Sequence, residues 1–217
     1  MSEKKHKIAR RVAQELEDGE LVNLGIGLPT LVANYIPEDV DITLHSENGF
    51  VGLGSTPPEG EEDEDLINAG GEPVTINPGG AFFDSATSFA IIRGGHLDTT
   101  VLGTLQVDAR GNLANWKIPD KLVPGMGGAM DLTTGAQKVI VATTHTTRRG
   151  EAKIVEKCNL PLTAENEVDL IVSELAVFAV KEDGLLLLER DEDTDLDVIT
   201  EKTEADFEVS SDLKTFA

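Results

Sequence analysis

The fold is decided by a stretch that reads Leu21-Val22-Asn23-Leu24-Gly25-Ile26-Gly27-Leu28-Pro29. The apolar run at 21–24 predicts a short buried strand. Pro29 suits the first turn of a helix, and Pro37 ends that helix. Residues 42–45, Ile-Thr-Leu-His, predict the next strand. Strand, helix and strand in this order predict a βαβ unit, in which the two strands are parallel.

Outside this unit, hydrophobic patterning predicts further helices and strands. Helices are expected over residues 8–16, over 84–93 with Ala86, Phe89, Ala90 and Ile91 buried, and over 195–207. Strands are expected over 74–76, 99–107, 139–142, 168–180 (two strands, with Glu174 between them) and 184–189. The acidic, Gly- and Pro-rich segment 49–72 predicts a solvated loop, and 111–128 predicts irregular structure. Because no repeat or linker interrupts the pattern, we expect one α/β domain over residues 1–217, with a largely parallel sheet flanked by helices.

Composition excludes several classes of protein. The 217 residues include 40 acidic and 18 basic side chains, for a net charge of −22, which repels nucleic-acid phosphates. No apolar run approaches the roughly 18 residues of a membrane span, and residues 1–11 are too charged for a signal peptide. Cys158 is the only cysteine, which excludes an internal disulfide or a cysteine-based metal cluster. We therefore expect a cytoplasmic protein that binds neither nucleic acid nor membrane; the acidic excess also suits a high-salt cell interior.

Few residue patterns predict a familiar catalytic centre. The four histidines are isolated, without metal-ligand spacing, so no metal site is expected. The sequence has neither a Gly-x-Ser-x-Gly elbow nor a phosphate-binding Gly-Lys-Ser/Thr loop. Gly25 and Gly27 follow a strand as in a dinucleotide site, but Pro29 and Thr30 stand near the place of the third glycine. These two glycines fit either an anion at a helix N-terminus or a tight strand-to-helix turn.

The segment Ser46-Glu47-Asn48-Gly49 is the best candidate for a reactive site. It follows a predicted parallel strand, and α/β sheets bind ligands at the carboxyl ends of such strands. Asn48 and Gly49 are residue types that adopt positive φ, which predicts a tight turn presenting Glu47. Further glycine clusters at 78–80, 94–95 and 125–128 fit backbone closing around a bulky ligand, or sharp turns in a compact fold.

Taken together, several sequence blocks resemble the β subunit of class I CoA-transferases, the 3-oxoacid (succinyl-CoA:acetoacetate) type. The blocks follow the family's order along most of the chain. They are Asn-Leu-Gly-Ile-Gly-Leu-Pro at 23–29, Ser-Glu-Asn-Gly at 46–49, Leu-Ile-Asn-Ala-Gly at 66–70, Ile-Arg-Gly-Gly-His at 92–96, Leu-Ala-Asn-Trp at 113–116, Met-Gly-Gly-Ala-Met-Asp-Leu at 126–132, Leu-Pro-Leu-Thr at 160–163 and Leu-Ala-Val-Phe at 175–178. The resemblance implies the fold shared by CoA-transferases and sugar-phosphate isomerases.

The resemblance also implies a mechanism and a set of site residues. Glu47 would be the nucleophile, forming an acyl-glutamyl anhydride and then a glutamyl-CoA thioester in ping-pong catalysis. A carboxylate is already ionised at neutral pH, so it needs no histidine base. The backbone of Gly128 would stabilise the oxyanion, and a glutamine of an α subunit would supply a second donor. The residues expected to form the cleft for CoA and substrate are Asn23, Gly25, Gly27, Asn48, Gly49 and Gly127.

The same resemblance implies partners and leaves alternatives open. We expect a separately encoded α subunit in a hetero-oligomer of ketone-body metabolism, with CoA as substrate and no resident cofactor. The alternatives are a 3-oxoadipate or acetate/butyrate–acetoacetate transferase, a thioester hydrolase, or a CoA-binding subunit without activity. Gly71 stands where the family usually has a lysine, which removes a cation near the CoA or the acid. Arg93, Lys117 and Lys121 remain as candidate cations for the CoA phosphates.

Overall fold

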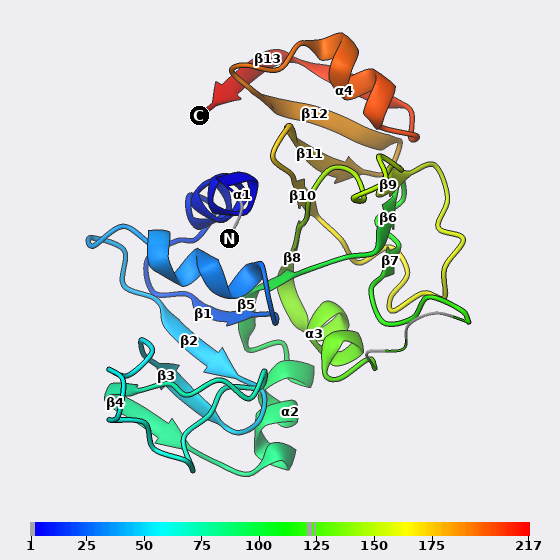
Figure 1. Cartoon of the computed structure of the whole chain (residues 1–217). Helices are drawn as coiled ribbons and strands as arrows, with labels where there is room; N and C mark the ends of the chain where they lie inside the picture. The colour runs from blue at the N-terminus through cyan, green and yellow to red at the C-terminus, as the bar shows by residue number, and fades with distance from the viewer. Residues whose placement is uncertain (1–2, 121–122, 124) are drawn as a thin grey trace.

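A computed structural model describes residues 3–120, 123 and 125–217. Within these residues, ten strands form one large sheet in the order β13-β12-β11-β10-β8-β5-β1-β2-β3-β4, and three strands form a small sheet in the order β7-β6-β9 (Figure 1). The large sheet consists of β1 (Leu21–Leu24), β2 (Thr43–Ser46), β3 (Phe50–Leu53), β4 (Ile76–Phe82), β5 (Leu97–Leu102), β8 (Ala136–Ala142), β10 (Leu170–Val172), β11 (Ala176–Lys181), β12 (Gly184–Asp191) and β13 (Phe207–Phe216). The small sheet consists of β6 (Gln106–Asp108), β7 (Leu113–Ala114) and β9 (Ile154–Val155).

The centre of the large sheet is parallel, as predicted. Strands β2, β1, β5, β8 and β10 run in one direction, and β1 lies between β2 and β5. The flanks β3–β4 and β11–β12 are antiparallel to their neighbours, and β13 returns parallel to β12. Chain connections therefore leave β1 in opposite directions across the sheet. In open α/β sheets, a crevice forms at the strand ends beside such a switch point.

Helices cover both faces of the parallel centre. α1 (Glu3–Ala13) and the 3₁₀ helix η1 (Pro29–Tyr35) lie on one face, while α2 (Ser85–Arg93) and α3 (Ala129–Gly135) lie on the other (Figure 1). Each face has its own apolar core, the first around Ile8, Val22 and Val101, the second around Ile92 and Leu132. The α/β fold with helices on both faces is thus confirmed. Among the described residues, every helix is too short or too polar to cross a membrane.

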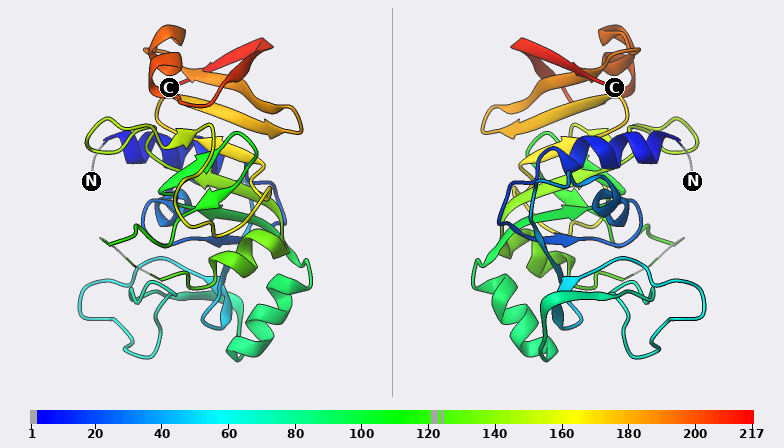
Figure 2. Two further views of the ribbon diagram at one scale, coloured as in Figure 1. Left: turned by 90° about the vertical axis from the view of Figure 1, so that its right-hand side faces the viewer. Right: turned by 90° about the vertical axis from the view of Figure 1, so that its left-hand side faces the viewer.

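Several local predictions were wrong. Residues 50–53 form strand β3 instead of a loop, and the predicted strand at 99–107 is two strands, β5 and β6. The last helix, α4 (Leu196–Lys202), ends early because Phe207–Phe216 forms β13. In α2 the buried residues are Ser88 and Ile92, whereas the predicted Ala86 and Ala90 are exposed and Phe89 and Ile91 are only half-buried. The hairpin β3–β4 and its long loop lie at the opposite end of the molecule from α4 and β13 (Figure 2).

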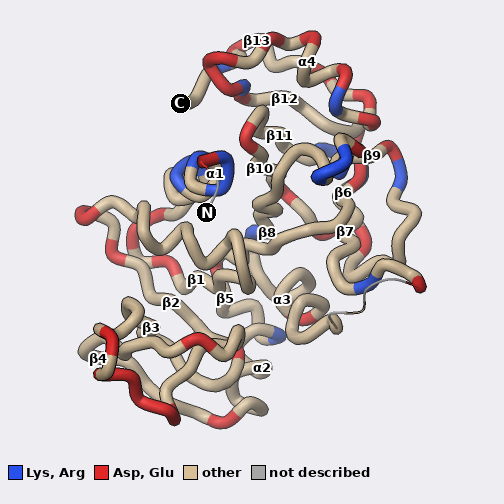
Figure 3. The backbone as a smooth tube through the Cα atoms, viewed as in Figure 1, with Lys and Arg blue, Asp and Glu red and all other residues tan. Residues whose placement is uncertain are grey.

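Basic side chains gather on α1, although the chain as a whole is strongly acidic (Figure 3). These side chains form ion pairs with acids of the antiparallel flank, and Arg11 is itself buried. The pairs are Lys4–Glu174 (3.0 Å), Lys7–Asp191 and Arg11–Glu189 (2.7 Å). The cations of α1 therefore hold the helix to β11 and β12.

His145 lies fully buried behind the carboxyl end of β8. Its Nδ1 is 2.8 Å from Ser173 Oγ, and its Nε2 is 2.9 Å from Thr203 Oγ1. Burial lowers the pKa of His145 to about 4, against the opposing effect of Glu174 and with a smaller contribution from Lys202. The imidazole is therefore neutral in the native protein at neutral pH, as a hydrogen-bonded link between three segments of the chain.

Acid is expected to destabilise the fold through His145. Below pH 6.5 the unfolded chain binds a proton that native His145, with a pKa of about 4, refuses, so stability falls by about 1.4 kcal/mol per pH unit. The loss approaches about 3 kcal/mol near pH 4, and nothing is lost above pH 7. Urea unfolding of the wild type and of His145→Gln between pH 7 and pH 4.5 measures it. The variant should be less stable at pH 7 but less sensitive to acid; equal pH slopes would contradict the assignment.

Candidate active site

The turn that carries Glu47 is short and tightly constrained. Glu47, Asn48 and Gly49 join the antiparallel strands β2 and β3. Gly49 has a φ of 136°, and a Cβ at this position would lie 2.3 Å from the carbonyl oxygen of Phe83. Only glycine fits there. The predicted positive φ is thus confirmed for Gly49 but wrong for Asn48. The turn leaves Glu47 half-buried at the carboxyl end of a central strand.

Asn23 holds the Glu47 carboxylate from the neighbouring strand. Its Nδ2 donates a hydrogen bond of 2.9 Å to Glu47 Oε2, and its side chain is completely buried in β1. The contact follows from the register, in which Asn23 lies opposite His45, two residues before Glu47. Hydrogen bonds of this charge-assisted kind are short and orient the acceptor. Asn23 therefore fixes one oxygen of the carboxylate.

Behind Asn23 lies a buried histidine. The Nδ1 of His45 is 3.4 Å from Asn23 Nδ2, and its Nε2 is 3.0 Å from Ser88 Oγ on α2. Burial lowers the pKa of His45, while the charge of Glu47 acts in the opposite direction. A neutral imidazole that accepts from Asn23 through Nδ1 donates through Nε2 to Ser88. Sequence reasoning treated His45 as an isolated histidine, because the link to Ser88 spans 43 residues.

Gly128 contacts the side chain of Glu47 directly. A Cβ at Gly128 would lie 3.4 Å from Glu47 Cγ and 3.3 Å from the ring of Phe89. Gly128 precedes the first residue of α3 and is buried, whereas Gly127 is exposed and has a φ of 53°. Glycine at 128 thus lets the backbone approach the carboxylate, and glycine at 127 permits the turn before it.

Gly25 and Gly27 shape the turn after β1 in different ways. Gly25 donates its N–H to the carbonyl of Val101 at 2.8 Å, and a Cβ would lie 3.0 Å from that oxygen. Gly27 has a φ of 92° and open space around it. Between them, the side chain of Ile26 is 66% exposed and stands at the rim of the cavity beside Glu47. These glycines therefore place the rim of the site.

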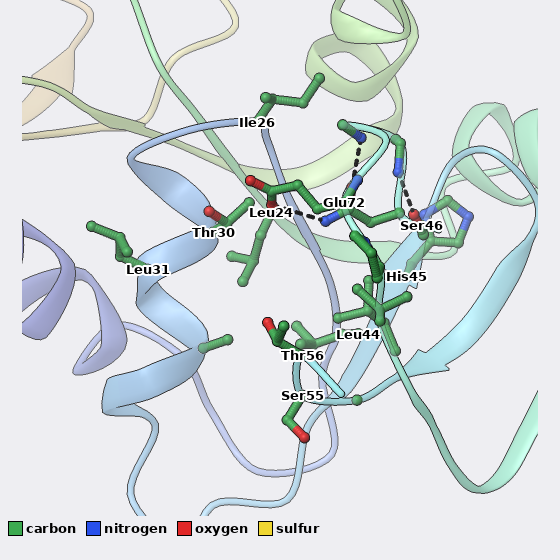
Figure 4. A pocket seen from close by; sticks show the side chains of 18 of the residues that line it. Leu24, Ile26, Thr30, Leu31, Leu44, His45, Ser46, Ser55, Thr56 and Glu72 are labelled. Atoms are coloured by element: carbon green, nitrogen blue, oxygen red, sulfur yellow. Dashed lines mark hydrogen bonds between the residues drawn. The ribbon is translucent and has the colours of Figure 1, made fainter. Parts of the chain in front are cut away.

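A cavity of about 510 Å³ opens beside Glu47 (Figure 4). Its walls are largely apolar and come from the segments 24–34, 44–47, 53–56 and 68–74. The last two segments belong to the region predicted as a solvated loop, and sequence reasoning missed their part in the site. The acidic run 59–65 between them is exposed, as predicted. The cavity has the size and apolar lining typical of small-molecule sites.

Asn48 and Ser46 fasten the missed wall to the turn. Asn48 Nδ2 donates to the carbonyl of Ile67 at 2.7 Å, and Ser46 Oγ accepts from the N–H of Ala69 at 3.2 Å. Ser46 Oγ also donates to Asn48 Oδ1 at 2.6 Å. Asn48 therefore acts on the loop that closes the cavity, and its side chain points to that loop and not to Glu47.

Three candidate cations have different outcomes. Arg93 is paired with Asp131 at 2.6 Å, and Lys117 lies over the ring of Trp116, 5.7 Å from its centre. Lys121 lies outside the described residues. Burial raises the pKa of Cys158 to about 12, which keeps this thiol protonated. Within the described part of the chain, no group of three or more His, Cys, Asp or Glu residues is arranged to bind a metal ion.

Comparisons with known proteins agree with this geometry. The Coenzyme A transferase family model matches residues 5–201. The chain is 58% identical to the β subunit of the acetate CoA-transferase of Escherichia coli K12, over 97% of this chain and 96% of that relative. It is 52% identical to the smaller-numbered counterpart in Helicobacter pylori 26695, the B-type subunit of succinyl-CoA:3-ketoacid coenzyme A transferase, over 93% and 97% respectively.

A solved structure is also similar over the whole chain. It is an acyl-CoA transferase of Escherichia coli O157:H7 in a thioester complex with CoA, with a TM-score of 0.74 and 26% identity. The match covers 100% of this chain and 44% of that one. With a family model that spans nine-tenths of its residues and relatives above 50% identity at full length, this chain belongs to the coenzyme A transferase family.

Proposed function

We propose that this chain is the β subunit of an enzyme that moves CoA between an acyl-CoA and a 3-oxoacid such as acetoacetate. Succinyl-CoA and acetyl-CoA are the two donors that its relatives' names suggest. The observation that carries the proposal is Glu47, oriented by Asn23 at 2.9 Å and in contact with Gly128, at the mouth of an apolar cavity. This arrangement suits a carboxylate nucleophile in ketone-body metabolism.

The chemistry requires four transfers at one carboxylate. Glu47 attacks the thioester carbonyl, giving a mixed anhydride and the CoA thiolate. The thiolate attacks the Glu47 carbonyl, giving a glutamyl-CoA thioester and the first free acid. The second acid attacks that thioester and regenerates an anhydride and a thiolate, which then attack in turn to form the new acyl-CoA. The thioester bond is exchanged at every step, so ATP is not needed.

The residues around Glu47 have distinct tasks in this proposal. The N–H of Gly128 donates to the oxyanion that forms in each attack, and such a donor typically contributes about 3–4 kcal/mol. Asn23 aims the carboxylate, and the apolar walls of the cavity keep water from the anhydride and the thioester. Gly25, Gly27, Asn48, Gly49 and Gly127 shape the loops around the cleft. We propose that CoA acts as substrate, without a resident cofactor.

The proposal includes a partner chain. The names of the relatives describe each of them as one of the subunits of a CoA-transferase, which supports a separately encoded α subunit in a hetero-oligomer. The Glu47 side of the cleft is open to such a partner, because Ile26 and Met130 on either side are exposed apolar side chains. A second oxyanion donor would come from that subunit.

Mixing this chain with its α subunit tests the function. With acetoacetate and an acyl-CoA donor, the mixture should form acetoacetyl-CoA and one equivalent of free acid. With acyl-CoA alone, intact-mass analysis should detect a covalent CoA adduct on Glu47 that hydroxylamine converts to a hydroxamate. Continuous acid release without an acceptor would indicate a hydrolase instead. Absence of an adduct in the assembled enzyme would indicate a non-catalytic subunit.

A further inference from the structure

The cavity beside Glu47 has an uneven distribution of charge. Most of its lining is apolar, with Leu24, Leu31 and Leu44 among the contributors. Among the described residues that line it, the only formally charged side chains are Glu47 and Glu72, and there is no lysine or arginine. His45 also lines the cavity, but its lowered pKa keeps it neutral. One carboxylate thus remains after the nucleophile is accounted for, and the proposed mechanism does not use it.

Glu72 is held in place by its own loop. Its N–H donates to Asn68 Oδ1 at 3.0 Å, its carbonyl accepts from the N–H of Asn68 at 2.9 Å, and Asn68 Nδ2 reaches Glu72 Oε2 at 3.4 Å. From this loop its side chain extends across the cavity towards Ile26 and Thr30 (Figure 4). The carboxylate therefore stands inside the cavity, on a backbone closed by three hydrogen bonds with one residue.

The neighbours of Glu72 leave its charge without compensation from this chain's described residues. Gly71 carries no side chain, has a φ of 78° and faces open space. Arg93 is occupied by Asp131. An acid bound with its reacting carboxylate at Glu47 would extend its far end along the apolar walls and near Glu72. A methyl group is well accommodated there, whereas a second carboxylate meets a like charge.

We propose that Glu72 is a specificity residue that selects monocarboxylic acids and 3-oxo monoacids over dicarboxylic acids. The inference rests on the proposed function and narrows it. Acetate, butyrate and acetoacetate belong to the accepted class, while succinate and 3-oxoadipate belong to the rejected class. Glu72 does not touch the reacting atoms, so its effect falls on the choice of acid.

A set of four-carbon acids tests this assignment. Butyrate and succinate differ in one terminal group, and succinamate replaces the far carboxylate of succinate with a neutral amide. With one acyl-CoA donor and the enzyme assembled with its α subunit, kcat/KM is measured for each acid. We expect succinate to be used at least about tenfold less well than butyrate, and succinamate to be closer to butyrate. At 1 M salt, where the Debye length is about 3 Å, the preference should shrink.

Glu72→Gln should raise the succinate-to-butyrate ratio of kcat/KM about tenfold. Glu64→Gln is the matched control, because Glu64 is an exposed acid of the same loop outside the cavity lining; it should leave the ratio within twofold. Equal use of succinate and butyrate by the wild type would overturn the inference, and so would equal effects of the two variants. Failure to use any of the three acids would instead refute the proposed function, and the specificity would fall with it.

Discussion

Glu47→Gln is expected to abolish CoA transfer, with a loss of at least about 10⁴-fold in kcat, while the protein stays folded. Removal of a covalent nucleophile typically costs this much or more. The amide is nearly the size of the carboxylate, and its Oε1 can still accept the hydrogen bond from Asn23 that Glu47 accepts at 2.9 Å. Packing against Gly128 is also retained, since the contact is made by Cγ. The change therefore removes the charge and the attacking oxygen without disturbing the turn.

The measurement combines kinetics with mass spectrometry. Wild-type enzyme incubated with acyl-CoA should gain the mass of a CoA thioester on the peptide that contains Glu47, and the variant should gain none. Glu47→Asp serves as a matched control, because it keeps the carboxylate but withdraws it by one methylene from Gly128. We expect activity between those of the wild type and Glu47→Gln. A CoA adduct on another residue, or transfer by Glu47→Gln within tenfold of wild type, would refute the nucleophile assignment.

The sequence predicted the part of the fold that local patterns encode. The run 21–24, the proline at 29 and the run 42–45 were sufficient for the parallel pair beside the site, because buried strands and proline-started helices have strong local signals. β13 was missed because this outermost strand carries six polar residues among ten and has mostly exposed side chains. α3 was missed because it has only seven residues and begins after Gly128, which has no side chain to cap it.

The site divides along the same line. Glu47 and Gly49 could be predicted because a strand end and a glycine turn are local features, and the family resemblance added Asn23 and Gly128. The wall at 68–74 could not be predicted, since its composition is that of a solvated loop and its contacts are distant in sequence. Ser46 and Asn48 reach Ala69 and Ile67 across 23 and 19 residues. Such tertiary hydrogen bonds leave no periodic pattern in the chain.

The second large effect is expected at Asn23. Asn23→Asp is nearly isosteric, but it replaces the amide donor with a carboxylate within hydrogen-bond distance of Glu47 Oε2, in a fully buried position. Two carboxylates this close cannot both be ionised at neutral pH, so they share one proton. The nucleophile is then largely blocked, and we expect transfer to fall about 10²- to 10³-fold at pH 7. Activity should recover partly as the pH rises and the shared proton is lost.

Asn23→Ala separates the lost hydrogen bond from the added charge. Without the amide, the Glu47 carboxylate is merely less well oriented, and a hydrogen bond to a charged group contributes about 1.5–3 kcal/mol, equivalent to roughly 10- to 150-fold. The alanine variant should therefore keep the shape of the wild-type pH–rate profile, while the aspartate variant acquires a rising limb. Circular dichroism and thermal unfolding check that both variants fold. If the two variants lost equal activity with parallel pH profiles, the amide of Asn23 would be a packing element of β1, and control of the Glu47 charge would lie elsewhere in the site.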